Sequence, residues 1–293
     1  MLTRPSIRLV TRRYVRENLL QCIGDPIQYV RRVVGSCVTT IINYGGLETW
    51  PSIVPRLYQA LDSPDTNLLD GAFSALHKIC EDSAPRLAAD VTTQPLQFLI
   101  PKFIQFFGHE SEVLRRYAVA SLYHFVQLMP PALTMHIDTY LQGLFALATD
   151  ADPTVRKCVC QALVGLLDSA LEKLAPHMGA LVQYMLQATV DADEAVSLEA
   201  CEFWGAICDT QIAHEALAPV LPQLIPVLLK GMVSAAPWAA PAEPAPSLRP
   251  ACTAARRASH PLPPPHPRRC RAELAPPAPT ALDADPPADL LGR

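Results

Sequence analysis

The sequence lacks the short motifs that mark most catalytic and nucleotide-binding sites. Among its 293 residues there is no GxGxxG, no GxxxxGKS or GxxxxGKT, no HExxH and no GxSxG, and the 12 glycines are isolated apart from Gly45 and Gly46. Such motifs supply phosphate-binding loops, zinc ligands and activated serine nucleophiles. Their absence predicts a protein that is not an enzyme and that uses no cofactor.

Metal chemistry has little support either. The 9 cysteines form no CxxC pair, and their odd number favours a reduced, intracellular chain over a disulfide scaffold. Cys158 and Cys160 are two residues apart, which on a helix turns their side chains about 200° away from each other. We therefore expect small core residues and no metal site. His77 falls on an apolar stripe and is predicted to be buried or half-buried.

Charge is sparse and unevenly spread. Residues 1–231 carry 17 Lys and Arg against 23 Asp and Glu, whereas residues 232–293 carry 7 against 5. Nucleic-acid affinity comes mostly from cationic surface, so an acidic body argues against nucleic acid and favours a basic protein partner. The longest uncharged run, 117–137, is long enough to span a bilayer but contains Pro130 and Pro131, so we expect no membrane helix.

The composition changes near Met232. Half of the segment 232–293 is Pro or Ala and no helical or strand period continues there, which is typical of a disordered, low-complexity tail. Residues 1–13 are rich in Arg and lack acids. Both a mitochondrial transit peptide and the first turns of a helix have this pattern. Between these ends, residues 14–231 are poor in proline and apolar side chains recur periodically.

One apolar stripe recurs five times in this body. Apolar residues follow a start point at offsets of about 4, 7, 8, 11 and 12, which places them on one side of an α-helix. The start points are Val30, Leu69, Leu114, Val155 and Val196. Their regular spacing, a period of about 40 residues, is typical of two-helix HEAT repeats. We predict an all-α, right-handed α-solenoid of about five and a half HEAT units over residues 14–231, with the sixth unit lacking its second helix.

The segments between the stripes agree with this prediction. A second apolar helix precedes each stripe, and Pro55, Pro101 and Pro226 inside three of these segments predict bends. Asp followed by Pro is a helix-start signal, because Asp can cap the first turn and Pro fits the first helical position. Such starts are expected at Asp25-Pro26, Ser63-Pro64-Asp65, Asp152-Pro153 and Asp193-Glu194.

An arginine follows the first stripe residue in three of the five units. Arg31, Arg115 and Arg156 are predicted to bond an Asp of their own turn or of the preceding turn, which would form a ladder along the solenoid. Asp70 and Ser197 occupy the same position in the other two units and are predicted to break that ladder.

Carboxylates point to a partner surface. Glu81 and Asp82 are predicted to end the inner helix of the second unit, on the concave side where solenoids wrap their partners. Solvated helix ends are the alternative interpretation of each of these residues. Further acids cluster in the fourth and fifth units: Glu172, Asp191, Asp193, Glu194, Glu199 and Glu202.

Particular residue strings, beyond the period, resemble one family. They are GAF at 71–73, KICEDSA at 78–84, IPKFIQFF at 100–107, HID at 136–138, LFALA at 144–148, VRK at 155–157 and LEACEFW at 198–204. These strings are similar to segments of the transportins, the karyopherin-β2 nuclear import receptors of the importin-β superfamily, with the type-2 paralogue nearest. The resemblance runs from Tyr14 to Met232 and covers the third to seventh repeats of such a receptor.

The resemblance implies a nuclear import receptor of cytoplasm and nucleus. Transportins bind Ran-GTP through an N-terminal arch and bind cargo with proline-tyrosine signals through a C-terminal arch. Nucleoporins are further candidate partners, and a long acidic loop in the eighth repeat couples Ran to cargo release. This chain is expected to be an N-terminal-arch fragment or splice variant without the first two repeats, the loop and the cargo arch, and to bind Ran-GTP weakly.

Glu81 and Asp82 are then the residues expected to face the basic surface of Ran. The alternative function is a generic HEAT-repeat scaffold, such as a phosphatase regulatory subunit, which would hold a catalytic partner instead of Ran. Selective retention of Ran-GTP over Ran-GDP distinguishes the two.

Overall fold

The structure is a computed structural model that describes residues 7–234, with side chains from 11 to 232. These residues lie in one compact unit, Met1–Ala240; the second unit, Pro241–Arg293, lies outside the described range. Every element within 7–234 is a helix and none is a strand. The predicted disordered tail at 232–293 therefore falls, except for its first three residues, outside what the structure describes.

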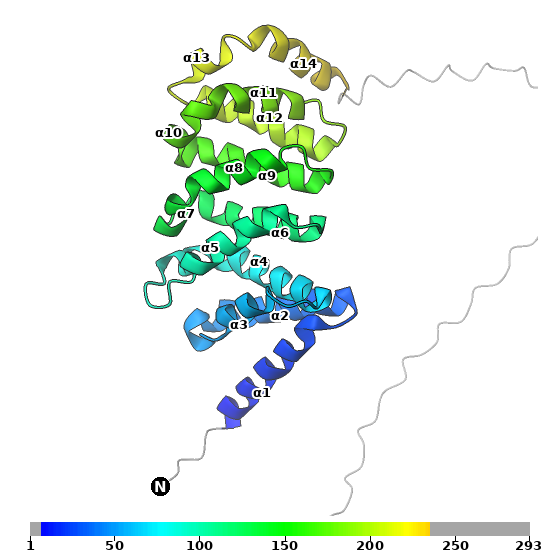
Figure 1. Cartoon of the computed structure of the whole chain (residues 1–293), viewed down its shortest axis with the longest axis vertical. Helices are drawn as coiled ribbons and strands as arrows, with labels where there is room; N and C mark the ends of the chain where they lie inside the picture. The colour runs from blue at the N-terminus through cyan, green and yellow to red at the C-terminus, as the bar shows by residue number, and fades with distance from the viewer. Residues whose placement is uncertain (1–6, 235–293) are drawn as a thin grey trace, which may run out of the picture. The chain divides into compact units, whose positions relative to one another are not determined.

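Five long helices form an inner layer in which each helix packs on the next one (Figure 1). They are α2 (Gln28–Gly45), α4 (Thr66–Ala89), α6 (Glu112–Val126), α9 (Pro153–Ser169) and α12 (Glu194–Cys208). Each carries one of the five apolar stripes that the sequence analysis identified. The inner face is defined here as the side chains of these five helices that are not covered by the other helices.

The outer layer supplies one helix ahead of each inner helix. Its members are α1 (Ile7–Gln21), α3 (Ile53–Ala60), α5 (Leu96–Gln105), α8 (Ile137–Leu147) and α11 (Met178–Ala188). Short helices precede the later ones: α7 (Pro131–Met135), α10 (Leu171–Leu174) and α13 (Ala213–Leu217), the last leading into α14 (Leu221–Ser234). Within residues 7–234, three 3-10 turns join the layers: η1 (Cys22–Gly24), η2 (Leu47–Thr49) and η3 (Phe106–Gly108). A fourth, η4 (Ala175–His177), lies between α10 and α11.

Five helix pairs and the unpaired α13–α14 confirm the predicted α-solenoid of about five and a half units. The predicted domain boundaries at 13 and 231 stay predictions. Helix α1 begins at Ile7 and α14 ends at Ser234, so the helices extend slightly past both positions.

Most of the helix starts agree with their sequence signals. Asp65, Asp152 and Asp193 cap α4, α9 and α12. Each carboxylate accepts hydrogen bonds from backbone N–H groups of the first helical turn at 2.8 to 3.2 Å. These bonds satisfy amides that the first helical turn leaves without a partner. The carboxylate of Asp25 accepts a hydrogen bond from the backbone N–H of Ile27 at 2.8 Å. Ile27 is the residue that precedes α2, so the helix begins later than directly after Asp25.

The five stripes form the core. In α6, α9 and α12 all stripe residues are buried, and Trp204 donates its indole N–H to Thr189 Oγ1 at 2.9 Å. The first stripe is less buried than predicted, because Val30, Cys37 and Ile41 stay half-exposed. Helix α2 has one inner-layer neighbour, α4, whereas each of the next three inner helices lies between two such neighbours.

Helix α4 contains the one non-helical residue found inside a described helix. Ser83 has φ −134° and ψ 19°, and Pro85 follows two residues later. The predicted helix end at Glu81 and Asp82 coincides with this kink, where two helical segments meet, and the second segment continues to Ala89. Pro101 and Pro226 are sixth in α5 and α14, so the carbonyl that each displaces belongs to the first turn, and the expected bends at the outer-layer prolines stay predictions.

Candidate protein-interaction surface

A row of arginines ties successive units together at the turns. Arg115 donates from Nε and Nη2 to the carboxylate of Asp150 at 2.7 and 2.8 Å, and Arg156 binds Asp191 in the same two-pronged way at 2.9 and 2.8 Å. Arg31 Nε donates to Asp70 at 2.8 Å. Each acceptor belongs to the following unit, which corrects the expectation of an Asp in the same or the preceding turn.

Each of these arginines also donates hydrogen bonds to the backbone of the turn that precedes its own helix. The Nη1 group donates to two backbone carbonyls five and six residues earlier, for example from Arg115 to His109 and Glu110, at 2.8 Å each. Burial alone would raise the pKa of Asp150, but the hydrogen bonds from Arg115 and from the Asp152 amide outweigh it, and the pKa is lowered. The Asp150 carboxylate is therefore ionised in its buried position.

The ladder has one gap. The prediction that Asp70 breaks it is wrong in part, because Asp70 is the acceptor for Arg31. Since Asp70 occupies the arginine position of the second unit, no ladder arginine extends from that unit to the third. Ser197 ends the row as predicted: its hydroxyl donates to the Thr189 carbonyl at 2.7 Å.

Glu81 and Asp82 both lie exposed on α4, immediately before the kink at Ser83. The carboxylate of Asp82 accepts from Asn43 Nδ2 on α2 at 3.1 Å, which orients it across the gap between two inner-layer helices. Glu81 lies at a pocket described below. The structure therefore brings both carboxylates to the inner face.

Most carboxylates of the acidic cluster in the fourth and fifth units have hydrogen-bond partners within the chain or lie off the inner layer. Asp191 is the acceptor for Arg156, Asp193 caps α12, and Glu199 accepts from Gln161 Nε2 at 2.9 Å. Glu172 lies on α10, outside the inner layer. Of this cluster, Glu194 and Glu202 are the exposed carboxylates on an inner-layer helix.

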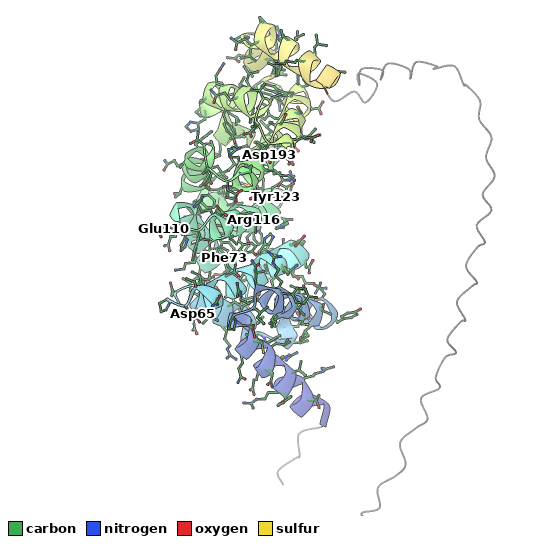
Figure 2. All side chains as sticks on the ribbon, turned by 90° about the vertical axis from the view of Figure 1, so that its right-hand side faces the viewer. Asp65, Phe73, Glu110, Arg116, Tyr123 and Asp193 are labelled. Carbon is green, nitrogen blue, oxygen red and sulfur yellow. The ribbon has the colours of Figure 1, made fainter. Side chains whose placement is uncertain are left out.

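The inner face also contains a basic pocket that no sequence pattern predicted. A cavity of about 480 Å³ opens between α2, α4 and α6. Arg32, Lys78 and Arg116 line it, one from each helix, together with Glu81 and His77. Figure 2 shows Arg116 on α6, separated from Glu110 in the turn before that helix. We call this cavity the inner pocket. Its cations come from three different repeat units, so no local motif identifies it.

His77 is half-buried, as predicted, at the wall of the inner pocket. Its Nδ1 lies 3.3 Å from the hydroxyl of Ser121 on α6. Burial, followed by the positive charges of His124, Lys78 and Arg116, lowers the pKa of His77 to about 4. The imidazole is therefore neutral at physiological pH.

This depressed pKa predicts acid sensitivity. The unfolded chain takes up a proton on His77 below pH 6.5, whereas the folded chain does so only near pH 4, so the free energy of unfolding should fall by about 3 kcal/mol between those values. His77→Gln should flatten that slope and the exposed His214→Gln should not. Urea denaturation at several pH values measures both, and equal slopes in the two variants would contradict the assignment.

Metal and membrane sites receive no support within the described residues. Cys160 is buried with its Sγ 3.5 Å from the Tyr184 hydroxyl, and Cys158 is half-buried. Residues 7–234 contain no group of three or more His, Cys, Asp or Glu side chains that could hold a metal ion. Over the same range, no helix is long and apolar enough to cross a membrane.

Known proteins share both the sequence and the architecture. Mouse transportin-1 is 48% identical over 219 residues, which cover 75% of this chain and 24% of the mouse protein. Importin subunit beta-2 of Schizosaccharomyces pombe is 47% identical over 221 residues, again 75% of this chain and 24% of the yeast protein. The chain belongs to the transportin family. No family model matches it.

Solved structures of low sequence identity to this transportin-family chain share its fold. Kap121p bound to Pho4p has a TM-score of 0.58 at 16% identity and covers 76% of this chain and 22% of its own. A designed armadillo repeat protein, YIII(Dq)4CqI, has a TM-score of 0.56 at 18% identity and covers 75% and 92%. The chain spans about a quarter of the length of the transportins that it matches. Its assignment to the type-2 paralogue stays a prediction.

Proposed function

We propose that this chain supplies part of the Ran-binding surface of a nuclear import receptor that works between cytoplasm and nucleus. Its relatives are named transportin and importin subunit beta-2, which supports a role in transport rather than catalysis. The observation that carries the proposal for this chain is the position of Glu81 and Asp82. Both are exposed on the inner face, where a wrapped partner would meet them.

The two carboxylates suit a basic partner surface. Asp82 is oriented by Asn43, and no ion pair within the described residues neutralises either acid. Exposed charges of this kind act mainly on the rate of encounter, because their field steers an oppositely charged partner. Ran-GTP is the proposed partner, and a generic scaffold would not distinguish the two nucleotide states of Ran.

Affinity should be modest. A wrapped partner draws its binding free energy from contacts over many repeats, and the entropic cost of association is offset only by their sum. This chain spans 24% of its relatives' length. We therefore expect Ran-GTP to bind it far more weakly than it binds a full-length transportin, and proline-tyrosine cargo not to bind measurably.

Charge reversal tests the proposed contact. The double variant Glu81→Lys, Asp82→Lys should lower the association rate with Ran-GTP roughly tenfold at low salt, and the effect should shrink at high salt because ions screen exposed charges. Surface-immobilised chain with Ran-GTP and Ran-GDP in solution measures the rates. Glu110→Lys with Glu172→Lys makes the same change in net charge away from the inner face and is the matched control. Equal retention of Ran-GDP, or equal effects of both double variants, would refute the proposal.

A further inference from the structure

The inner pocket gathers three cations that the rest of the described structure does not neutralise. Arg32 on α2, Lys78 on α4 and Arg116 on α6 have no ion pair within residues 11–232. The Arg116 guanidinium lies over the ring of Tyr117 at 5.3 Å, which restricts its plane. By contrast, Arg31, next to Arg32 on α2, is paired with Asp70 on α4.

The charge of the pocket calls for a dianion. The three cations contribute +3 and Glu81 contributes −1, while His77 is neutral, so the pocket carries +2 at neutral pH. A phosphate monoester carries about −1.5 to −2 at pH 7, whereas one carboxylate carries −1. A single phosphate group therefore balances the pocket, and its three oxygens can accept hydrogen bonds from cations on three sides.

The remaining walls suit a phosphate that is attached to a chain. The hydroxyl of Ser74, on α4, has no hydrogen-bond partner among the described residues and is a further donor at the pocket. Val33 also lines the cavity and is exposed, so it offers an apolar contact beside the charged one. At about 480 Å³ the pocket has room for the residues that flank a phosphate as well as for the phosphate itself.

We propose that the inner pocket binds a phosphoserine-bearing peptide segment, with Arg32, Lys78 and Arg116 around the phosphate and Val33 beside the flanking residues. The proposed Ran contact takes a basic surface whereas this site takes an anion, and the assay for this site contains no Ran, so either proposal can fail without the other. Glu81 borders both sites, and its charge opposes the phosphate.

Binding of a short labelled peptide tests the proposal. The probe is a fluorescein-labelled pentapeptide of Gly and Ser with one central phosphoserine, titrated with the whole chain and followed by fluorescence anisotropy. Arg116→Gln should weaken binding about tenfold, since a hydrogen bond to a charged group is lost. Lys173→Gln on the outer layer removes the same charge and should change the affinity less than twofold.

A variant that is expected to raise the affinity distinguishes a lost contact from a misfolded chain. Glu81→Gln removes the one anion of the pocket and should tighten binding about threefold, a gain that a damaged fold cannot produce. Equal binding of the unphosphorylated peptide, equal losses in Arg116→Gln and Lys173→Gln, or no gain in Glu81→Gln would overturn the proposal. Competition by inorganic phosphate at the peptide's own concentration would also overturn it, since the site would then take the free ion.

Discussion

Replacing Phe73 with alanine should lower the free energy of unfolding by about 4 kcal/mol, in line with other buried Phe-to-Ala changes. Phe73 on α4 is fully buried and is labelled in Figure 2. Its ring stacks on Phe103 at 5.2 Å between centroids and meets Phe106 edge-on at 4.9 Å, and Tyr117 lies 6.0 Å away. Truncation would leave a cavity between the second and third units that these rings cannot fill.

Urea denaturation followed by circular dichroism measures this loss. Because neighbouring repeats are coupled only through their shared interface, weakening this one should also separate the transition into two steps. Tyr44→Ala is the matched control: that side chain is 92% exposed, so its removal should change stability by less than about 0.5 kcal/mol. A loss below about 1 kcal/mol in Phe73→Ala would show that the ring cluster does not hold the two units together.

Asp150→Ala should cost about 3 kcal/mol, because it breaks a pair that is largely withdrawn from water. The side-chain exposures are 15% for Arg115 and 5% for Asp150. Removing one member of such a pair leaves a charge that is neither solvated nor neutralised. The Asp152 amide loses an acceptor as well, since Asp150 Oδ1 accepts from it at 2.9 Å.

A second substitution separates the free-energy cost of the unpaired Arg115 charge from the cost of the lost contacts. Arg115→Met with Asp150→Ala should be more stable than Asp150→Ala alone, because no unpaired cation remains. Asp138→Ala is the exposed counterpart, since Asp138 lies 4.0 Å from Lys173 and both side chains are largely in water. It should have almost no effect on thermal or urea unfolding. Additive losses in the double variant would contradict this account.

The repeat period was the strongest signal in the sequence, and it was enough to predict the helices and most of their core. The stripes of Leu114, Val155 and Val196 are buried as expected, because α6 and α9 each lie between two inner helices and α12 is packed against α9, α11 and α13. Val30 stays half-exposed because its burial depends on which helix lies beside α2, and the period of α2 alone contains no information on that.

Features that depend on how units align sideways were not predictable. Arg115 pairs with an Asp of the following unit, 35 residues later, and the spacing within one turn does not indicate which turns lie side by side. The inner pocket combines side chains from three helices and has no motif of its own. The kink at Ser83 is different, since Pro85 inside a helical pattern is a recognisable signal for it.

The arginine ladder has a consequence for how the chain folds. Its links join residues only 35 to 39 positions apart, and the main contacts between inner helices are with the next helix in the row. The contact order of the solenoid therefore stays low however many units are added, so closing each contact costs little chain entropy. Any adjacent pair of units can act as the nucleus, and folding can spread from it in both directions while the chain emerges from the ribosome.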